Sequence, residues 1–239
     1  MHVCGAALDK ALQGVTRLFV VTGHNPAMAE QQIGVMEAAE KAGAKYLVRV
    51  SGGRAIVQPD SPSVVGRGHH VIEEALRKSR LGWVILRPGL FMQNIFAQAA
   101  LIKGEGKMAM AFPKDKPMAL TDVRDTGALG ARVVADPAPH AGKTYEFTGK
   151  LTSYGEFADV LAQVLGKPIA YVTTTVEQLE QTMRSRNMPD WLVTHLVTVA
   201  RVGIDGGFST ENMQPIRDIV KRDPITTRKF VEDHKGAFS

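Results

Sequence analysis

The chain has 239 residues, a net charge of +5 and a hydrophobic content of 44%. This length fits one α/β domain, or one domain with a small appended lobe, and the apolar residues are numerous enough to fill a core. No apolar run approaches the roughly 18 residues of a membrane span, and the basic residues are spread along the chain as in a solvated face, so we expect neither a membrane protein nor a nucleic-acid-binding protein.

The amino-terminal segment lacks a basic stretch followed by an apolar one, so we expect no secretion signal. The single cysteine, Cys4, has no partner for an internal disulfide, and we interpret it as structural or incidental. One unpaired cysteine fits a reducing compartment, and we expect a cytoplasmic protein.

The first half of the sequence predicts alternating helices and strands. Asn25 is expected to cap the second helix, with Pro26 in its first position. The alternation predicts a parallel sheet with helices on both faces. The expected elements are, in chain order, a helix at 6–14, a buried strand at 18–21, a helix at 26–41, a strand at 45–50, a helix at 66–79 and a strand at 83–86.

The second half predicts shorter strands between helices. Ser153 is expected to cap a helix with Glu156 in a capping box, and Asp125 with Thr126 to cap a helix of small residues. Residues 108–117 are expected to form a loop or a hairpin arm. The other expected elements are helices at 94–103, 126–136, 153–165, 176–186, 191–200 and 226–234, and strands at 118–123, 143–148 and 169–172.

Two loops follow the strands on either side of the helix at 66–79. In parallel α/β sheets, ligands bind outside the carboxyl ends of the strands. We therefore expect any active site to lie between these two loops, which are Ser51-Gly52-Gly53 and Arg87-Pro88-Gly89-Leu90-Phe91.

Several stretches of sequence occur in an order and spacing typical of one family. They are AAEKAGAKYLVRVS, HHVIEEALRKSRLGWVILRPGLFMQNI, LTDVRDTGALGARVVADPAPHAGKTYEFTG, and LTSYGEFADVLAQVLGKPIAYV with a late RDPITTRKFVEDHKGAF. Together they resemble the NmrA-like, atypical short-chain dehydrogenase/reductase family of NAD(P)-binding proteins. The resemblance implies a Rossmann-like α/β fold that binds NADP(H) or NAD(H), with a smaller C-terminal α/β lobe. We expect residues 1–107 and 118–150 to form the cofactor-binding domain, and residues 108–117 and 151–239 to form the substrate-side lobe.

The glycine-rich turn of that family is missing from this sequence. The family's G-x-x-G-x-x-G turn holds the pyrophosphate at a helix N-terminus, whereas Gly5, Gly14 and Gly23 have a different spacing. The resemblance thus implies an N-terminally truncated sheet that lacks a βαβ unit of roughly 30 residues or more. We expect weakened dinucleotide binding and unpaired backbone at the strand edge that this unit would cover.

The resemblance places two candidate catalytic residues, Ser51 and His69. Ser51 stands where short-chain dehydrogenases carry a serine that orients a substrate carbonyl, although a serine there also satisfies its own turn. With Glu73 as the anchor, His69 and Val65 occupy the lysine and tyrosine positions of the usual Tyr-x-x-x-Lys pair, so the usual acid is missing. His69 can donate a proton near neutral pH, or it can be a packed or ribose-contacting histidine.

The resemblance also implies the binding residues. Thr22 and Gly23 end a strand where the family's loop passes the ribose and pyrophosphate, and Asn94 caps a helix or contacts a ligand. No metal-ligand spacing is present, because His69 and His70 are adjacent. The expected cofactor-binding residues are Thr22, Gly23, Ser51, Gly52, Pro88, Gly89, Leu90 and Phe91, and the expected substrate-binding residues are Phe91 and Asn94.

Three hypotheses for function follow. The first is an NAD(P)H-dependent oxidoreductase that passes hydride to a quinone or carbonyl-type small molecule. The missing Tyr-x-x-x-Lys pair favours the second, a non-catalytic NAD(P)-sensing regulator, and the third is a truncated product with impaired cofactor binding. The expected partner is a small-molecule substrate, and the chain is expected to be a monomer or a homodimer.

Overall fold

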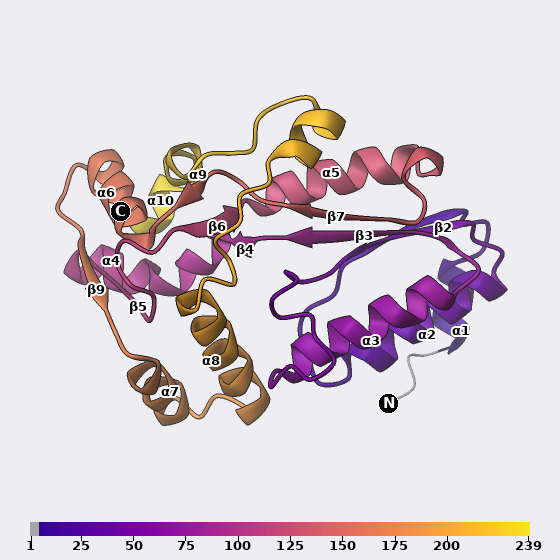
Figure 1. Cartoon of the computed structure of the whole chain (residues 1–239), viewed down its shortest axis with the longest axis horizontal. Coiled ribbons are helices and arrows are strands. Elements are labelled where there is room, and N and C mark those ends of the chain that lie inside the picture. The colour runs from indigo at the N-terminus through magenta and orange to yellow at the C-terminus, as the bar shows by residue number, and fades with distance from the viewer. Residues whose placement is uncertain (1–4) are drawn as a thin grey trace. The chain divides into compact units, whose positions relative to one another are not determined.

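A computed structural model of the chain describes residues 5–239 (Figure 1). The interpretation of Cys4 lies outside the described residues. The chain divides into two compact units: the first holds the chain up to Pro88 together with residues 126–146, and the second holds residues 89–125 and 147–239. The predicted cofactor-binding and substrate-side domains are defined by what they bind, and they stay a prediction.

The first unit is built on a four-stranded sheet with the strand order β1-β2-β3-β7. Strands β1 and β3 both pair in parallel with β2, so that Val20 lies opposite Arg49 and Val50 lies opposite Leu86. Helices α2 and α3 cover one side of the sheet and α5 covers the other (Figure 1), which confirms the Rossmann-like arrangement with helices on both faces. The elements are α1 (Gly5–Ala11), β1 (Arg17–Val20), α2 (Met28–Lys41), β2 (Tyr46–Val50), α3 (Val64–Lys78), β3 (Gly82–Pro88), α5 (Val123–Ala135, here from residue 126), η2 (Ala138–His140) and β7 (Lys143–Phe147).

Helix α3 follows its sequence pattern closely. Its first turn is capped by Ser63, whose Oγ accepts a hydrogen bond from the Gly66 backbone N–H at 3.1 Å. A Cβ at residue 66 would lie 2.4 Å from the Ile56 carbonyl oxygen, so glycine allows this turn to lie directly against the preceding loop. The predicted inner stripe is confirmed as buried: Val65, His69, Ile72 and Leu76.

Strand β1 is an edge strand, and the expectation that it would be buried is wrong. Among the described residues, only β2 pairs with it. Phe19 is 38% exposed and Val21 is 60% exposed. An apolar run reports strand propensity, but burial also requires neighbours on each side, and a short run cannot reveal whether they exist.

Asn25 does not cap α2 as predicted. The helix begins at Met28 after Ala27, and the Asn25 side-chain oxygen accepts a hydrogen bond from the Ala27 N–H at 2.9 Å. The Asn25 carbonyl oxygen accepts a second bond, from the Met28 N–H, at 3.1 Å. Asn25 therefore builds a turn in front of the helix, a conformation that its short polar side chain favours, and Pro26 lies inside this turn.

The second unit contains small sheets and the helices of the C-terminal third. Strand β4 pairs in parallel with β6, β6 pairs antiparallel with β8, and β5 pairs in parallel with β9. The predicted capping box is confirmed, with Ser153 and Glu156 bonded to each other's backbone N–H groups. The elements are β4 (Leu90–Phe91), η1 (Met92–Gln98), α4 (Ala99–Glu105), β5 (Lys107–Met110), β6 (Met118–Thr121), β8 (Leu151–Thr152), α6 (Tyr154–Leu165), β9 (Ala170–Thr173), α7 (Val176–Ser185), α8 (Asp190–Ile204), η3 (Ile216–Val220), α9 (Thr227–Asp233) and α10 (Lys235–Phe238).

Two local predictions for the second unit are corrected. Residues 108–117 were expected to form a loop or a hairpin arm, but the first of them belong to strand β5, which pairs in parallel with the distant β9, with Lys107 opposite Ala170. Helix α5 begins at Val123 rather than after a cap at Asp125 and Thr126. The Asp122 carboxylate accepts from the Arg124 N–H at 2.8 Å, while Asp125 accepts from the Ile225 N–H at 2.9 Å.

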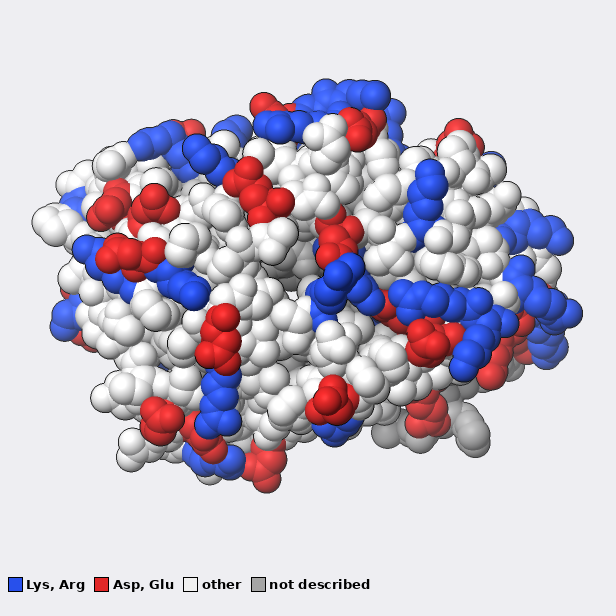
Figure 2. All heavy atoms as spheres, in the orientation of Figure 1, with Lys and Arg blue, Asp and Glu red and all other residues white. Residues whose placement is uncertain are grey.

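Charged side chains of both signs are interspersed on the face shown in Figure 2. Some adjacent charges form ion pairs: Arg184 on α7 lies 2.8 Å from Glu180 and 2.8 Å from Asp190. Within residues 5–239, no helix is long and apolar enough to cross a membrane.

Candidate functional site

The predicted site residues of the first unit gather at one edge of its sheet. Thr22 and Gly23 follow β1, Ser51 and Gly52 follow β2, and Pro88 is the last residue of β3. The parallel register brings these strand ends to the same edge, and the Ser51 N–H donates to the Leu86 carbonyl oxygen at 2.7 Å. This is the edge at which parallel α/β sheets bind ligands.

Ser51 is bonded to a buried carboxylate. Its hydroxyl donates to Glu73 Oε1 at 2.6 Å. Arg87 on β3 forms a two-point contact with the same carboxylate, at 3.0 Å from Nε to Oε1 and 2.6 Å from Nη2 to Oε2. Arg77 adds a third cationic contact at 2.8 Å. Helix α3 is thereby fixed to the ends of β2 and β3.

The electrostatics of this cluster favour an ionised Glu73. Burial by itself raises the pKa of Glu73, but the hydrogen bonds from Arg87 and Ser51 outweigh burial and leave the pKa below its usual value. Because the Ser51 proton points to this carboxylate, Ser51 must exchange partners before it can donate to a substrate carbonyl. Its predicted catalytic role stays a prediction.

His69 lies four residues before Glu73 on the same helix and belongs to a second polar cluster. Arg49 Nη2 lies 2.6 Å from His69 Nδ1, and Arg49 Nε donates to Gln32 Oε1 at 2.7 Å. Gln32 Nε2 in turn donates to Thr22 Oγ1 at 2.6 Å. A chain of four side chains therefore connects the loop after β1 with α3.

Arg49 is the unusual member of this second cluster. Its side chain is 1% exposed, and Nη1 has no hydrogen-bond partner among the described residues. Burial lowers the pKa of Arg49 to about 10, a change that the nearby Glu73 opposes, so the guanidinium remains charged at neutral pH. Arg49 and Gln32 were not predicted as site residues. The signal in the sequence was an arginine inside the apolar strand KYLVRVS, because a buried charge requires partners.

Gly52 leaves space for the His69 ring. A Cβ at residue 52 would lie 3.3 Å from His69 Cδ2 and 3.7 Å from Nε2. The ring of His24, in the loop after β1, meets His69 edge-to-face with 5.5 Å between ring centroids. The Nε2 side of His69 thus lies beside the loop at the carboxyl end of β2.

The predicted residues of the second unit have clear structural contacts. The Gly89 N–H donates to the Phe147 carbonyl oxygen at 3.0 Å, and a Cβ at residue 89 would lie 2.3 Å from the Ala119 carbonyl oxygen. Only glycine fits such an approach. Leu90 and Phe91 form β4, opposite Leu120 and Thr121 of β6. Their predicted roles in ligand binding stay predictions.

Asn94 does not cap a helix. It lies inside η1, which begins after Phe91 without a side-chain cap. The neighbouring Gln93 makes the polar contacts instead, donating to Asp122 Oδ1 at 3.0 Å and accepting from the Val123 N–H at 3.1 Å. Asn94 is exposed, and its predicted contact with substrate stays a prediction.

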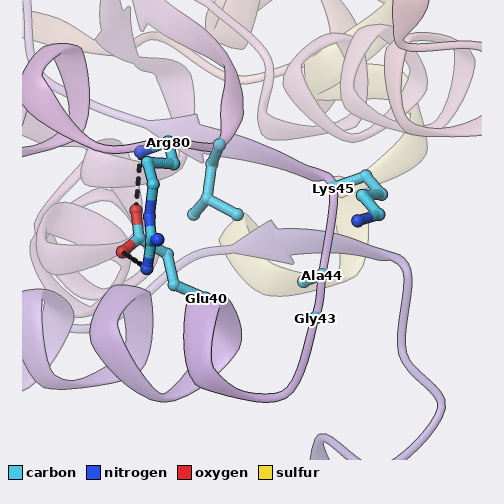
Figure 3. Close-up of a pocket in the computed structure, with 6 residues that line it drawn as sticks. Glu40, Gly43, Ala44, Lys45 and Arg80 are labelled. Carbon is cyan, nitrogen blue, oxygen red and sulfur yellow. Dashed lines mark hydrogen bonds and ion pairs between the residues drawn. The ribbon is translucent and has the colours of Figure 1, made fainter.

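A surface pocket of about 270 Å³ lies at the opposite edge of the first-unit sheet. Figure 3 shows Glu40 of α2 turned toward Arg80, whose backbone N–H donates to Glu40 Oε1 at 2.7 Å. Gly43, Ala44 and Lys45 line the pocket near the start of β2. None of the predicted site residues lines it. Among the residues described, no group of three or more His, Cys, Asp or Glu side chains is arranged to hold a metal ion.

A sheet of parallel strands flanked by helices, with polar side chains gathered at the carboxyl ends of the strands, defines the Rossmann-like class of α/β proteins. The sequence model that describes the NmrA-like family matches residues 5–220 of this chain. The chain belongs to the NmrA-like family.

Individual relatives agree with this assignment. The chain is 30% identical to an NAD(P)H azoreductase of Xenophilus azovorans, over 97% of this chain and 79% of the relative. The solved structure of an NADPH-dependent quinone oxidoreductase from Escherichia coli, in complex with NADPH, matches with a TM-score of 0.83 and 26% identity, over 97% of this chain and 80% of that one. The transcriptional regulator NmrA in complex with NAD matches at 15% identity with a TM-score of 0.76, over 96% of this chain and 76% of that one, which shows the shared fold alone.

Proposed function

We propose that this protein is an NAD(P)H-dependent oxidoreductase that reduces a quinone or carbonyl-type small molecule. The similarity over almost the whole chain to an NAD(P)H azoreductase carries this proposal. The E. coli quinone oxidoreductase supports it independently, at 26% identity. The regulatory hypothesis has weaker support, because the match to the NmrA regulator has only 15% identity.

We propose that the first-unit sheet edge binds part of a dinucleotide. Thr22 and Gly23 are exposed there, and a Cβ at residue 23 would meet no atom within 4 Å, so the backbone is open to a ligand. Gly52 and Pro88 end the next two strands at the same edge. These four residues are the proposed contacts, with Ser51, Gly89, Leu90 and Phe91 as further ones. The glycine-rich turn that would hold the pyrophosphate is absent from the printed sequence.

A bound reduced nicotinamide supplies a hydride, and the acceptor then needs a proton. His69 is the proposed hydrogen-bond donor to the acceptor oxygen, because its Nε2 side lies beside the Gly52 loop at the binding edge, and the proton itself comes from water. Glu73, held by Ser51 and Arg87, fixes α3 and so the position of His69 on it. Phe91 and Asn94 of the second unit are the proposed substrate contacts. A quinone is a suitable acceptor, since it requires less help from a positioned acid than a simple carbonyl does.

The test is steady-state oxidation of NADPH and NADH with a panel of quinones and small carbonyl compounds. We expect turnover by the wild-type chain and a loss on the order of 10²-fold in kcat for His69→Ala, the size of the contribution of one hydrogen-bond donor to a developing oxyanion. His70→Ala is the matched control, because His70 is the adjacent histidine outside the Arg49 cluster, and it should keep wild-type rates.

Cofactor binding is measured separately by thermal stabilisation. A nucleotide at a hundred times its dissociation constant should stabilise the fold by about 2.7 kcal/mol. Stabilisation without turnover across the panel would refute the reductase and support a nucleotide sensor. Full turnover by His69→Ala would exclude His69 as the hydrogen-bond donor to the acceptor.

A further inference from the structure

The strand β2 carries a buried cation whose hydrogen-bond acceptors are both neutral. Arg49 is 1% exposed, and it donates from Nε to the Gln32 amide oxygen and from Nη2 to His69 Nδ1. Burial of a charged group costs free energy unless an opposite charge pairs with it, so the presence of a buried guanidinium with neutral acceptors needs an explanation. We explain it by the effect of Arg49 on the hydrogen-bonding states of Gln32 and His69.

A guanidinium has donors only. The nitrogen that faces Arg49 Nη2 at 2.6 Å must therefore accept, which leaves His69 Nδ1 without a proton. In a neutral imidazole the single proton is then on Nε2. Protonation of Nδ1 would place two donors and two positive charges in contact, so the arrangement also disfavours the imidazolium form.

The same guanidinium orients the other end of the chain. Because Gln32 Oε1 accepts from Arg49, the amide nitrogen of Gln32 faces Thr22 and donates to its hydroxyl oxygen at 2.6 Å. The Thr22 hydroxyl accepts in that bond, so its own proton can be donated elsewhere. Arg49 thus makes hydrogen-bond donors of both Thr22 and His69, which lie at the binding edge of the sheet.

We propose that Arg49 is a positioning residue that holds His69 neutral, with its proton on Nε2 and directed to the edge where an acceptor-rich ligand binds. In the proposed reductase, the neutral His69 would donate an Nε2–H hydrogen bond to the acceptor oxygen, and the proton that completes the reduction would come from water. This use of Nε2–H rests on the proposed reductase function. The tautomer itself does not, since it follows from contacts within the first unit.

Some of the charged and titratable groups around His69 favour the charged form of its imidazole, and others disfavour it. Arg49 of β2 disfavours the charged imidazole, whereas Glu73, one turn further along α3, favours it, and Arg87 of β3 holds Glu73 by two hydrogen bonds. His24 faces the ring edge-to-face, and desolvation together with the Arg49 charge lowers the pKa of His24, which keeps it neutral near pH 7. Arg49 makes the direct contact, and its effect on Nδ1 is therefore the dominant one.

The experiment is NMR of the ¹⁵N-labelled full chain, in the absence of any ligand, across a pH titration. The signals of His69 are identified among those of the 7 histidines by their loss in His69→Gln. We expect the Nε2–H tautomer and a pKa of His69 below the ordinary value of about 6.5. A proton on Nδ1, or a titration at or above the ordinary value, in the wild-type chain would overturn the assignment.

Two variants separate a positioning role from a packing role. Arg49→Met removes the donor and the charge at similar length, and the pKa of His69 should rise by about one unit or more. Arg49→Lys keeps the charge and should restore the low value at least in part. An unchanged pKa in Arg49→Met overturns the proposal, and if that variant does not fold, the wild-type tautomer and Arg49→Lys still decide it.

The two proposals fail separately. A reductase whose His69 carries its proton on Nδ1 overturns the role of Arg49 and leaves the reductase function intact. A chain with the expected tautomer and no turnover supports the role of Arg49 and refutes the reductase.

Discussion

Helix α3 contributes to two polar clusters one turn apart, and the buried charge in each cluster has a different kind of partner. Glu73 is matched by opposite charges from Arg87 and Arg77 and by the Ser51 hydroxyl. Arg49 instead donates to the neutral acceptors Gln32 and His69, and its Nη1 has no hydrogen-bond partner within residues 5–239. A fully matched cluster serves the fold, whereas an incompletely matched one marks a candidate site, because such a charge can change the chemistry of its neighbours.

The largest expected effect is the loss of the matched charge. In Glu73→Gln, the half-buried Arg87 loses its main partner, and the free energy of unfolding should fall by about 3–5 kcal/mol. Urea denaturation measures this change. Glu74→Gln is the matched control, because the Glu74 side chain is 45% exposed and its pair with Arg77 should contribute about 1 kcal/mol or less. Equal losses of unfolding free energy in Glu73→Gln and Glu74→Gln would contradict the stabilising role of the Glu73 cluster.

The pairing of the Glu73 carboxylate also makes the stability of the fold depend on pH. The pKa of Glu73 is lower in the folded state, so its pairing stabilises the fold above the unfolded value of about 4.3 and is lost as the pH falls through the folded value. Urea titrations at a series of pH values should show this acid loss in the wild-type chain and a smaller one in Glu73→Gln.

An intermediate effect is expected from the second cluster. Arg49→Met removes a buried cation but leaves Gln32 Oε1 and His69 Nδ1 without their donor, so the cost should be about 1–3 kcal/mol in urea denaturation. Arg54→Met is the control, since the Arg54 side chain is 74% exposed, and it should change stability by less than about 1 kcal/mol. A loss for Arg49→Met as large as that for Glu73→Gln would mean that both clusters serve the fold alike.

The smallest effect is expected at the rim of the matched cluster. Arg77 is 32% exposed, and Glu73 keeps its contact with Arg87 when Arg77 is removed. Arg77 also lies over the Trp83 ring, 5.7 Å from its centroid. We expect Arg77→Ala to cost about 1 kcal/mol, measured by urea denaturation, and a double variant with Glu74→Gln to separate the two partners. A cost close to that of Glu73→Gln would show that Arg87 alone cannot match the carboxylate.

The parts of the fold that the sequence predicted are those set by local pattern. The stripe of α3 and the capping box of Ser153 depend on residues three or four positions apart, and both are present. Strand β5 depends on β9, more than sixty residues away, whereas residues 108–117 were expected to form a loop or a hairpin arm. The exposure of β1 likewise depends on which strands adjoin it, which its own residues do not encode.

The candidate site was predictable only in part for the same reason. Ser51 and His69 were predicted because a family resemblance supplied their positions, and their catalytic roles stay predictions. Arg49 was missed because its role depends on Gln32 of α2 and His69 of α3, and only the folded sheet brings these two side chains to one cation. An arginine between Val48 and Val50 in an apolar strand was the single signal in the sequence.

The division of the first unit into two stretches of chain sets an order of events during synthesis. Strand β7 lies beside β3 in the sheet but is translated only after residues 89–125 of the second unit. Until residue 147 has left the ribosome, β3 is an open edge, and Arg87 lacks the carboxylate of Glu146 that lies 2.9 Å away in the finished protein. We expect a nascent chain stalled within this interval to expose an unpaired strand edge, at which a strand of another chain can add.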